Sequence, residues 1–160
     1  TLTILLKKTY LQSEVIGIDG DAKILEIAET KAKTANIQIR LEKGMSNDLP
    51  FLDESFDQVV SSLFFHHLTR ENKLKTLREV RRVLKPGGEF HLADWGVPSN
   101  FLMRLGSYLV QFFDGFETTS DNFNGLLPKL LAETGFELIE ETNSFNTVFG
   151  TIRLYCSSKP

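Results

Sequence analysis

The hydrophobic positions along the chain follow two periods, one typical of strands and one typical of helices. Short apolar or alternating runs predict strands, and patterns with a period of 3.6 between them predict amphipathic helices. The expected strands cover residues 15–18, 37–42, 56–62, 89–95, 136–145 and 147–157. The expected helices cover residues 1–10, 21–36, 69–84, about 99–114 and about 122–134. Asp21 and Thr69 are placed to cap two of these helices, and Asn36 is placed to end one.

Strands and helices alternate over most of the chain, which is the order that produces a parallel sheet. We therefore expect an α/β fold of Rossmann-like type. It would be an open, mostly parallel twisted sheet with helices on both faces and a C-terminal antiparallel strand pair. The chain has 160 residues, of which 41% are hydrophobic, and this is the size and composition of one globular domain. A single domain over residues 1–160 is predicted.

Charge and cysteine content narrow the classes of partner and compartment. The 21 acidic and 18 basic residues give a net charge of -3, so the chain lacks the basic excess of a nucleic-acid-binding module. The single cysteine, Cys156, excludes an internal disulfide and favours a reducing compartment. No apolar run approaches the roughly 20 residues that cross a bilayer, and the first residues lack a signal-peptide layout. These features predict a cytoplasmic protein without a nucleic-acid or membrane partner.

The most apolar stretch, residues 101–113, is interrupted by Arg104, Ser107 and Gln111. We expect a buried helix or a lid over the site, and a membrane-surface helix is the less favoured alternative. As a lid, together with residues 114–119, it would indicate a partly apolar substrate. Ordinary core is an equal alternative.

Chemistry is expected just after the strands, because ligands of an open parallel sheet lie beyond the carboxyl ends of its strands. Those positions are Asp19, residues 44–47, residues 61–67 and residues 94–96. A carboxylate that ends a strand can accept hydrogen bonds from both hydroxyls of a ribose, and Asp19 fits that role. Asp19 as a turn or cap residue is the alternative, of equal weight.

Three segments together carry a resemblance to a known family. They are VIGID at residues 15–19, DLPFLDESFD at residues 48–57 and LREVRRVLKPGG at residues 77–88. In this order they resemble the class I S-adenosylmethionine-dependent methyltransferases of the type 11-like group, and the likeness runs from Thr1 to about Trp95. The resemblance implies S-adenosylmethionine as cofactor and methyl transfer to a small-molecule substrate. Because the cofactor supplies the reactive carbon, alignment does most of the catalytic work, and no catalytic residue is singled out.

The resemblance also implies which residues meet the cofactor. Asp19 would hold the ribose, with Gly20 beside it. Met45 and Ser46 would lie along the adenine, where many members of the family carry Gly-Asp-Ala and this chain carries Gly44-Met45-Ser46. Met45 could pack against the ring, and filling a gap in the core is its alternative role. Ser62 and Leu63, after the strand at 56–62, would also border the cofactor.

His66, His67 and Trp95 are the candidates for binding the substrate, and either imidazole could serve as a base. Adjacent residues diverge on a helix, so we expect the two histidines neither to serve one atom nor to hold a metal. The alternatives are a histidine exposed at a helix start and a tryptophan in the core or at its rim.

Members of the family carry a central strand and a Gly-x-Gly-x-Gly turn ahead of the segment that resembles the start of this chain. Nothing precedes Thr1, so we expect a sheet without its central first strand. The strands ending at Asp19 and near Ser62 would then either pair directly or receive a segment from a second copy, and we favour the homodimer. Two other functions stay open: a non-catalytic module that cannot hold the cofactor, and a nicotinamide-dependent reductase that uses Asp19 for a ribose.

Overall fold

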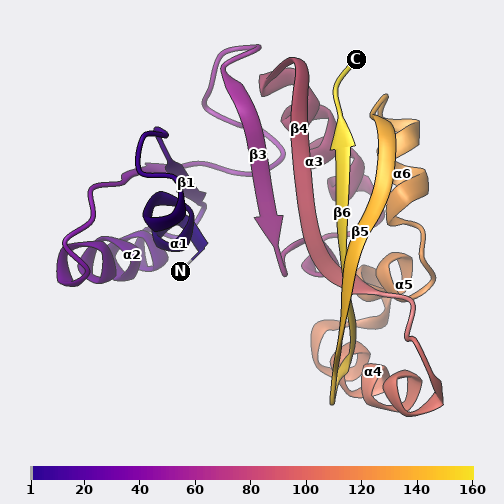
Figure 1. The fold of residues 1–160 in the computed structure, drawn as a ribbon. Coiled ribbons are helices and arrows are strands. Elements are labelled where there is room, and N and C mark those ends of the chain that lie inside the picture. The colour runs from indigo at the N-terminus through magenta and orange to yellow at the C-terminus, as the bar shows by residue number, and fades with distance from the viewer. Residues whose placement is uncertain (1) are drawn as a thin grey trace. The chain divides into compact units, whose positions relative to one another are not determined.

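A computed structural model describes residues 2–160 of the chain (Figure 1). The chain divides into two compact units, one ending at Pro50 and the other formed by Phe51–Pro160. Each unit is described by itself, and the single domain over residues 1–160 stays a prediction. None of the helices in the described part of the chain has both the length and the apolar character needed to cross a membrane.

The first unit is a parallel strand pair with two helices. Its elements are α1 (Leu2–Thr9), β1 (Ile16–Asp19), α2 (Ala22–Thr34) and β2 (Arg40–Lys43). β1 and β2 pair in register, with Asp19 opposite Lys43, so their carboxyl ends lie together. As predicted, Asp21 caps α2, because its side chain accepts a hydrogen bond from the Lys23 amide at 2.9 Å.

The second predicted strand begins later than residue 37. Asn36 takes a left-handed backbone conformation with φ of 52°, as its place at the helix end predicts. The Ile37 amide then donates to the Ala32 carbonyl at 3.0 Å, which closes the end of α2. Residues 37–39 therefore belong to the loop that ends the helix, and β2 starts at Arg40.

The second unit is a four-stranded mixed sheet with helices. Its strands are β3 (Phe56–Ser62), β4 (Leu84–Gly96), β5 (Glu137–Thr147) and β6 (Gly150–Ser158), in the order β3-β4-β6-β5. Its helices are η1 (Phe65–His67, a 3-10 turn), α3 (Arg70–Val83), α4 (Phe101–Asp114), α5 (Phe116–Phe123) and α6 (Leu127–Glu133). β3 and β4 are parallel, whereas β4, β6 and β5 are antiparallel. The predicted α/β class with its C-terminal antiparallel pair is confirmed.

Two predicted boundaries in this unit are wrong. β4 begins at Leu84 and includes the Lys-Pro-Gly-Gly segment, because Leu84 already pairs with Phe56 and a bulge carries the register on to Glu89. The helix predicted at about 122–134 is two helices, α5 and α6, which separate at Gly125. Gly125 has φ of 71°, a backbone conformation that ends a helix and that L side chains rarely adopt.

The core of the second unit lies between the sheet and the helices α3 and α6, and Figure 1 shows α3 behind β4. Its fully buried members are apolar side chains from both layers: Phe65, Leu77, Leu84, Phe90, Leu127 and Leu131. Burial of each such side chain stabilises the fold by about 1.5 to 3 kcal/mol. The core thus fixes β3 and β4, whose carboxyl ends carry the candidate residues.

The two sheets leave two strands with an unpaired edge. Among the described residues, β1 pairs only with β2, and β3 pairs only with β4. Direct pairing of β1 with β3 and a segment lent by a second copy both stay predictions.

Candidate functional site

The candidate cofactor residues of the first unit meet at the carboxyl ends of β1 and β2. The Asp19 carboxylate accepts a hydrogen bond from the Asp21 amide at 2.9 Å through Oδ1, so Asp19 does shape the turn. This bond uses Oδ1 and leaves the ribose role of Asp19 a prediction. The alternatives of turn residue and ribose ligand are thus compatible.

Gly20 and Met45 lie in direct contact. A Cβ at position 20 would come within 2.9 Å of the Met45 sulfur, so a side chain there would displace the Met45 side chain from its present place. The Met45 side chain is 60% exposed, which excludes the alternative role of filling a core gap within this unit. Ser46 follows in a tight turn that the Asp48 amide closes on the Met45 carbonyl at 3.1 Å. Asp19, Gly20, Met45 and Ser46 therefore form one surface.

In the second unit the chain turns sharply after β3. Ser62 is the last residue of that strand, and Leu63 has φ of 50°, which is uncommon for a branched side chain. The Leu63 amide donates to the Ala93 carbonyl of β4 at 2.8 Å, and this bond holds the turn to the sheet. The chain continues from this turn directly into η1, which contains His66 and His67.

Asp94 on β4 organises this turn. The carboxylate is fully buried and its Oδ2 accepts the Phe64 amide at 3.0 Å and the Phe65 amide at 2.7 Å. Its Oδ1 accepts the Trp95 amide at 2.7 Å and contacts His66 Nδ1 at 2.6 Å. Asp94 thereby provides a hydrogen-bond acceptor for the amides at the start of η1, which have no partner within the turn. It also fixes the orientation of the His66 imidazole.

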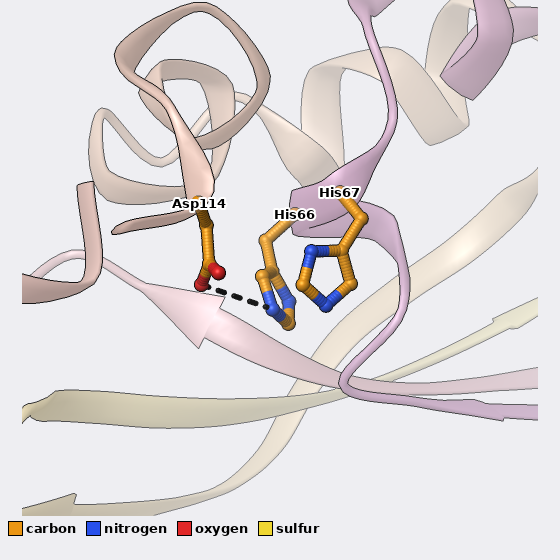
Figure 2. A group of neighbouring side chains, drawn as sticks. All are labelled: His66, His67 and Asp114. Carbon is orange, nitrogen blue, oxygen red and sulfur yellow. Dashed lines mark ion pairs between the residues drawn. The ribbon is translucent and has the colours of Figure 1, made fainter. Parts of the chain in front are cut away.

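The two histidines lie side by side, and the prediction that they diverge is wrong. Their ring centroids are 3.9 Å apart, and Figure 2 shows both rings turned to the same side of η1. The prediction considered only the directions of the Cβ atoms, whereas rotation about the side-chain bonds brings the rings together. His66 is buried and His67 is exposed, so only His67 matches the alternative of an exposed helix-start histidine.

Asp114, the last residue of α4, joins this pair. Its Oδ2 lies 3.8 Å from His66 Nε2, as the dashed line in Figure 2 marks. The Trp95 ring also lies near this pair, 6.4 Å from His66 and stacked on Phe123 at 6.2 Å. The second unit thus brings together His66, His67 and Trp95 with Asp94 and Asp114, and the substrate-binding role of the first three stays a prediction.

α4 faces outward with its apolar side, so the expectation of a buried helix is wrong. Its buried residues are the polar Ser107 and Gln111. Gly106 lies so close to the Val148 carbonyl that a Cβ there would overlap it, and this small residue lets α4 pack tightly against the turn after β5. The bulky apolar residues line an open groove of about 740 Å³, formed by Leu102, Met103, Leu105, Gly106, Tyr108, Leu109, Phe112, Phe116 and Val148.

A buried ion pair fixes α5 to α3. Lys73 is fully buried and its ammonium donates to the Thr118 carbonyl at 2.5 Å and to Asp121 at 3.4 Å, while Arg70 also binds Asp121. Burial lowers the pKa of Lys73. Burial alone would raise the pKa of Asp121, but the hydrogen bond from Arg70 and the charges of Lys73 and Arg70 hold it below its ordinary value.

Sequence reasoning missed Asp114, Lys73 and Asp121. A signal existed for Lys73, because it lies four residues before Leu77 on the face of α3 that points inward. No comparable signal exists for Asp114, which follows the last apolar residue of α4 like any solvated helix end.

The chain matches a known protein family. The family model described as "Methyltransferase domain" matches residues 1–88. A demethylmenaquinone methyltransferase of Lactobacillus johnsonii is 35% identical over 108 residues, which is 66% of this chain and 43% of that protein. An uncharacterized methyltransferase of Synechocystis is 35% identical over 127 residues, 79% of this chain and 58% of that protein. This chain therefore spans about half the length of these curated relatives.

The fold has a close counterpart among solved structures. The YcgJ protein of Bacillus subtilis superposes with a TM-score of 0.72 and 18% sequence identity, covering 91% of this chain and 82% of that chain. This similarity concerns the fold.

Proposed function

The chain belongs to the methyltransferase-domain family, and we propose that it transfers a methyl group from S-adenosylmethionine to a small, largely apolar acceptor. The match of the family model to residues 1–88 carries this proposal. Asp19 would hold the ribose diol, and Gly20, Met45 and Ser46 would lie along the adenine. Ser62 and Leu63 would border the cofactor from the turn after β3. These residues bind and align, and positioning of this kind can contribute about 7 to 11 kcal/mol to catalysis.

Titration calorimetry of the 160-residue chain with S-adenosylmethionine tests the cofactor site. We expect Asp19→Ala to weaken binding by about 1.5 to 3 kcal/mol for each charge-assisted hydrogen bond to the ribose that is lost. Asp21→Ala is the matched control, since Asp21 caps α2 and is not assigned to the ligand. Equal dissociation constants for Asp19→Ala and the unchanged chain would remove Asp19 from the site. Absence of heat at millimolar cofactor would favour the non-catalytic module, and heat with reduced nicotinamide cofactors alone would favour the reductase.

The acceptor is proposed to be apolar because of the groove beside α4. Leu105 and Leu109 in this groove are more than half exposed, and Phe112 and Phe116 flank Asp114. An apolar body could lie along the groove, with its reacting end at His66, His67 and Trp95. Among the relatives, the Lactobacillus johnsonii protein is named for demethylmenaquinone, and an acceptor of that chemical kind suits such a groove.

Incubation with S-adenosylmethionine and demethylmenaquinone in detergent micelles, followed by mass spectrometry, tests the acceptor. We expect a mass gain of one CH₂ unit, because the methyl group replaces a hydrogen that leaves as a proton, with a lower rate for Asp19→Ala and a higher KM for Leu109→Ser. Cofactor binding without methylation of demethylmenaquinone would exclude this acceptor and leave methyl transfer to another one.

The proposal includes an oligomeric state, the homodimer. Within its own unit β1 pairs with β2 and β3 pairs with β4, and a homodimer in which a second copy adds a strand would use the other edge of each, because exposed edges template further pairing. Light scattering over a concentration series tests this, and a constant mass of one chain, 18.1 kDa, would contradict it.

The single free Cys156 supports a reducing compartment such as the cytoplasm, which cell fractionation can check. The net charge of -3 supports the absence of a nucleic-acid partner.

A further inference from the structure

We propose that His66, His67 and Asp114 form a binding site for a divalent transition-metal ion. Each residue offers one ligand atom, and these three atoms lie within 4.8 Å of one another. Figure 2 shows the two rings and the carboxylate converging from η1 and from the end of α4. All three belong to the second unit, and the inference does not depend on the proposed methyl transfer.

The hydrogen bonds of Asp94 determine which nitrogen of His66 is available. Asp94 accepts the amides of Phe64, Phe65 and Trp95, so its carboxylate acts as an acceptor throughout. The short contact of 2.6 Å to His66 Nδ1 therefore places the ring proton on Nδ1. In the neutral ring Nε2 then carries a lone pair.

That lone pair faces a second acceptor. His66 Nε2 is 3.8 Å from Asp114 Oδ2, which is too long for a hydrogen bond. Metal ions bind imidazole nitrogen and carboxylate oxygen at about 2.0 to 2.2 Å, so two such ligands of one tetrahedral ion lie roughly 3.4 Å apart. A movement of about half an ångström would let both groups bind one ion, and the ion would satisfy two acceptors that otherwise repel each other.

The donor set determines the class of ion. Two imidazoles and one carboxylate suit Zn²⁺, Fe²⁺, Co²⁺ or Mn²⁺, whereas Ca²⁺ and Mg²⁺ prefer oxygen ligands. The contact of His66 with Asp94 is the arrangement in which a buried carboxylate orients a metal-binding histidine. His67 is exposed, so a fourth position would be open to water or to a substrate atom, as in catalytic metal sites.

A second group with metal-binding side chains carries less weight. Glu89, His91 and Cys156 also lie within 4.8 Å of one another. His91 Nε2 already contacts Glu89 at 3.1 Å, a hydrogen-bond distance, so these two groups satisfy each other without an ion. Burial together with the charges of Glu89 and Glu140 raises the pKa of the Cys156 thiol, which disfavours the thiolate that a metal needs.

Cobalt titration of the 160-residue chain carrying His91→Asn tests the proposal, because this substitution removes the second group. We expect one equivalent of Co²⁺ to bind with visible d–d absorption, and Zn²⁺ to displace it. His67→Ala and Asp114→Asn should each weaken binding at least tenfold. Asp57→Asn is the matched control, since Asp57 is an exposed carboxylate of the same unit that pairs with Lys85.

Two outcomes would overturn the inference. One is equal Co²⁺ affinity in the His91→Asn chain with and without Asp114→Asn. The other is no Co²⁺ binding, together with ¹⁵N chemical shifts at pH 7 showing both nitrogens of His66 protonated. In that case a second proton, and not a metal, would lie between His66 and Asp114.

Discussion

Replacing Asp94 with Asn tests how the turn after β3 is organised. The substitution keeps the shape of the side chain but exchanges one acceptor oxygen for an NH₂ donor. Oδ2 accepts the backbone amides of Phe64, Phe65 and His66, so we expect the amide oxygen of Asn to take that position. The NH₂ group then faces the Trp95 amide and His66 Nδ1.

The loss of folding stability in Asp94→Asn follows from these contacts. The Trp95 amide loses its acceptor, which costs about 1 to 3 kcal/mol where the group is desolvated. Loss of the charge on the remaining hydrogen bonds adds about 1.5 to 3 kcal/mol. A total of roughly 2.5 to 6 kcal/mol is a large part of the about 5 to 15 kcal/mol that stabilises an ordinary domain, so the variant should fold but be only weakly stable.

His66 must also change tautomer. Because Nδ1 now meets a donor, its proton moves to Nε2, which then points at Asp114 as an N–H group. Urea denaturation measures the free energy of unfolding, and ¹H–¹⁵N correlation spectra of the imidazole report the tautomer. Asp114→Asn is the control, since this carboxylate lies 3.8 Å from Nε2 and should change stability by less than about 1 kcal/mol.

The reasoning fails if Asp94→Asn lowers the free energy of unfolding by less than about 1 kcal/mol, or if it leaves the proton on Nδ1. Either result would mean that Asp94 does not hold His66 and the start of η1 in the manner described.

Two further substitutions test the helices around the site. Asp121→Ala leaves the buried Lys73 charge without its partner and should destabilise the chain by about 3 to 5 kcal/mol. The pKa of Asp121 is held below 3.8 in the fold, so stability should fall as pH drops below that value; acid titrations of urea midpoints that are parallel in variant and wild type would contradict this. Gly106→Ala should lower the melting temperature, because the new Cβ overlaps the Val148 carbonyl, although alanine favours helices by about 1 kcal/mol; an unchanged or higher melting temperature would exclude the close approach.

Local patterns in the sequence determined most of the secondary structure. Strand and helix periods depend on neighbouring residues, and caps such as Asp21 and Thr69 act within one turn, so both were readable along the chain. The position of Asp19 after a buried strand was predicted for the same reason. A predicted boundary was wrong where pairing with a residue distant in sequence determines it. Leu84 is the example, because its pairing with Phe56 starts β4 earlier than predicted.

The tertiary structure alone decided which face of α4 points outward. Its sequence separates a bulky apolar face from a face that carries Gly106, Ser107 and Gln111, and hydrophobicity alone predicts that the apolar face is buried, whereas the structure exposes it. The close approach of Gly106 to Val148 turns the small and polar residues inward and leaves the bulky ones to form the groove. Steric fit between segments distant in sequence is not encoded in the local pattern.

The same holds for the cluster around His66. The sequence predicted two histidines after a strand, but their meeting with Asp114 depends on where α4 ends, and the tautomer of His66 depends on Asp94 in a neighbouring strand. Hydrogen bonds and charge pairs act over a few ångströms in space, whatever the distance along the chain. The chemistry of this site is therefore a property of the folded unit, whereas its position after β3 is a property of the sequence.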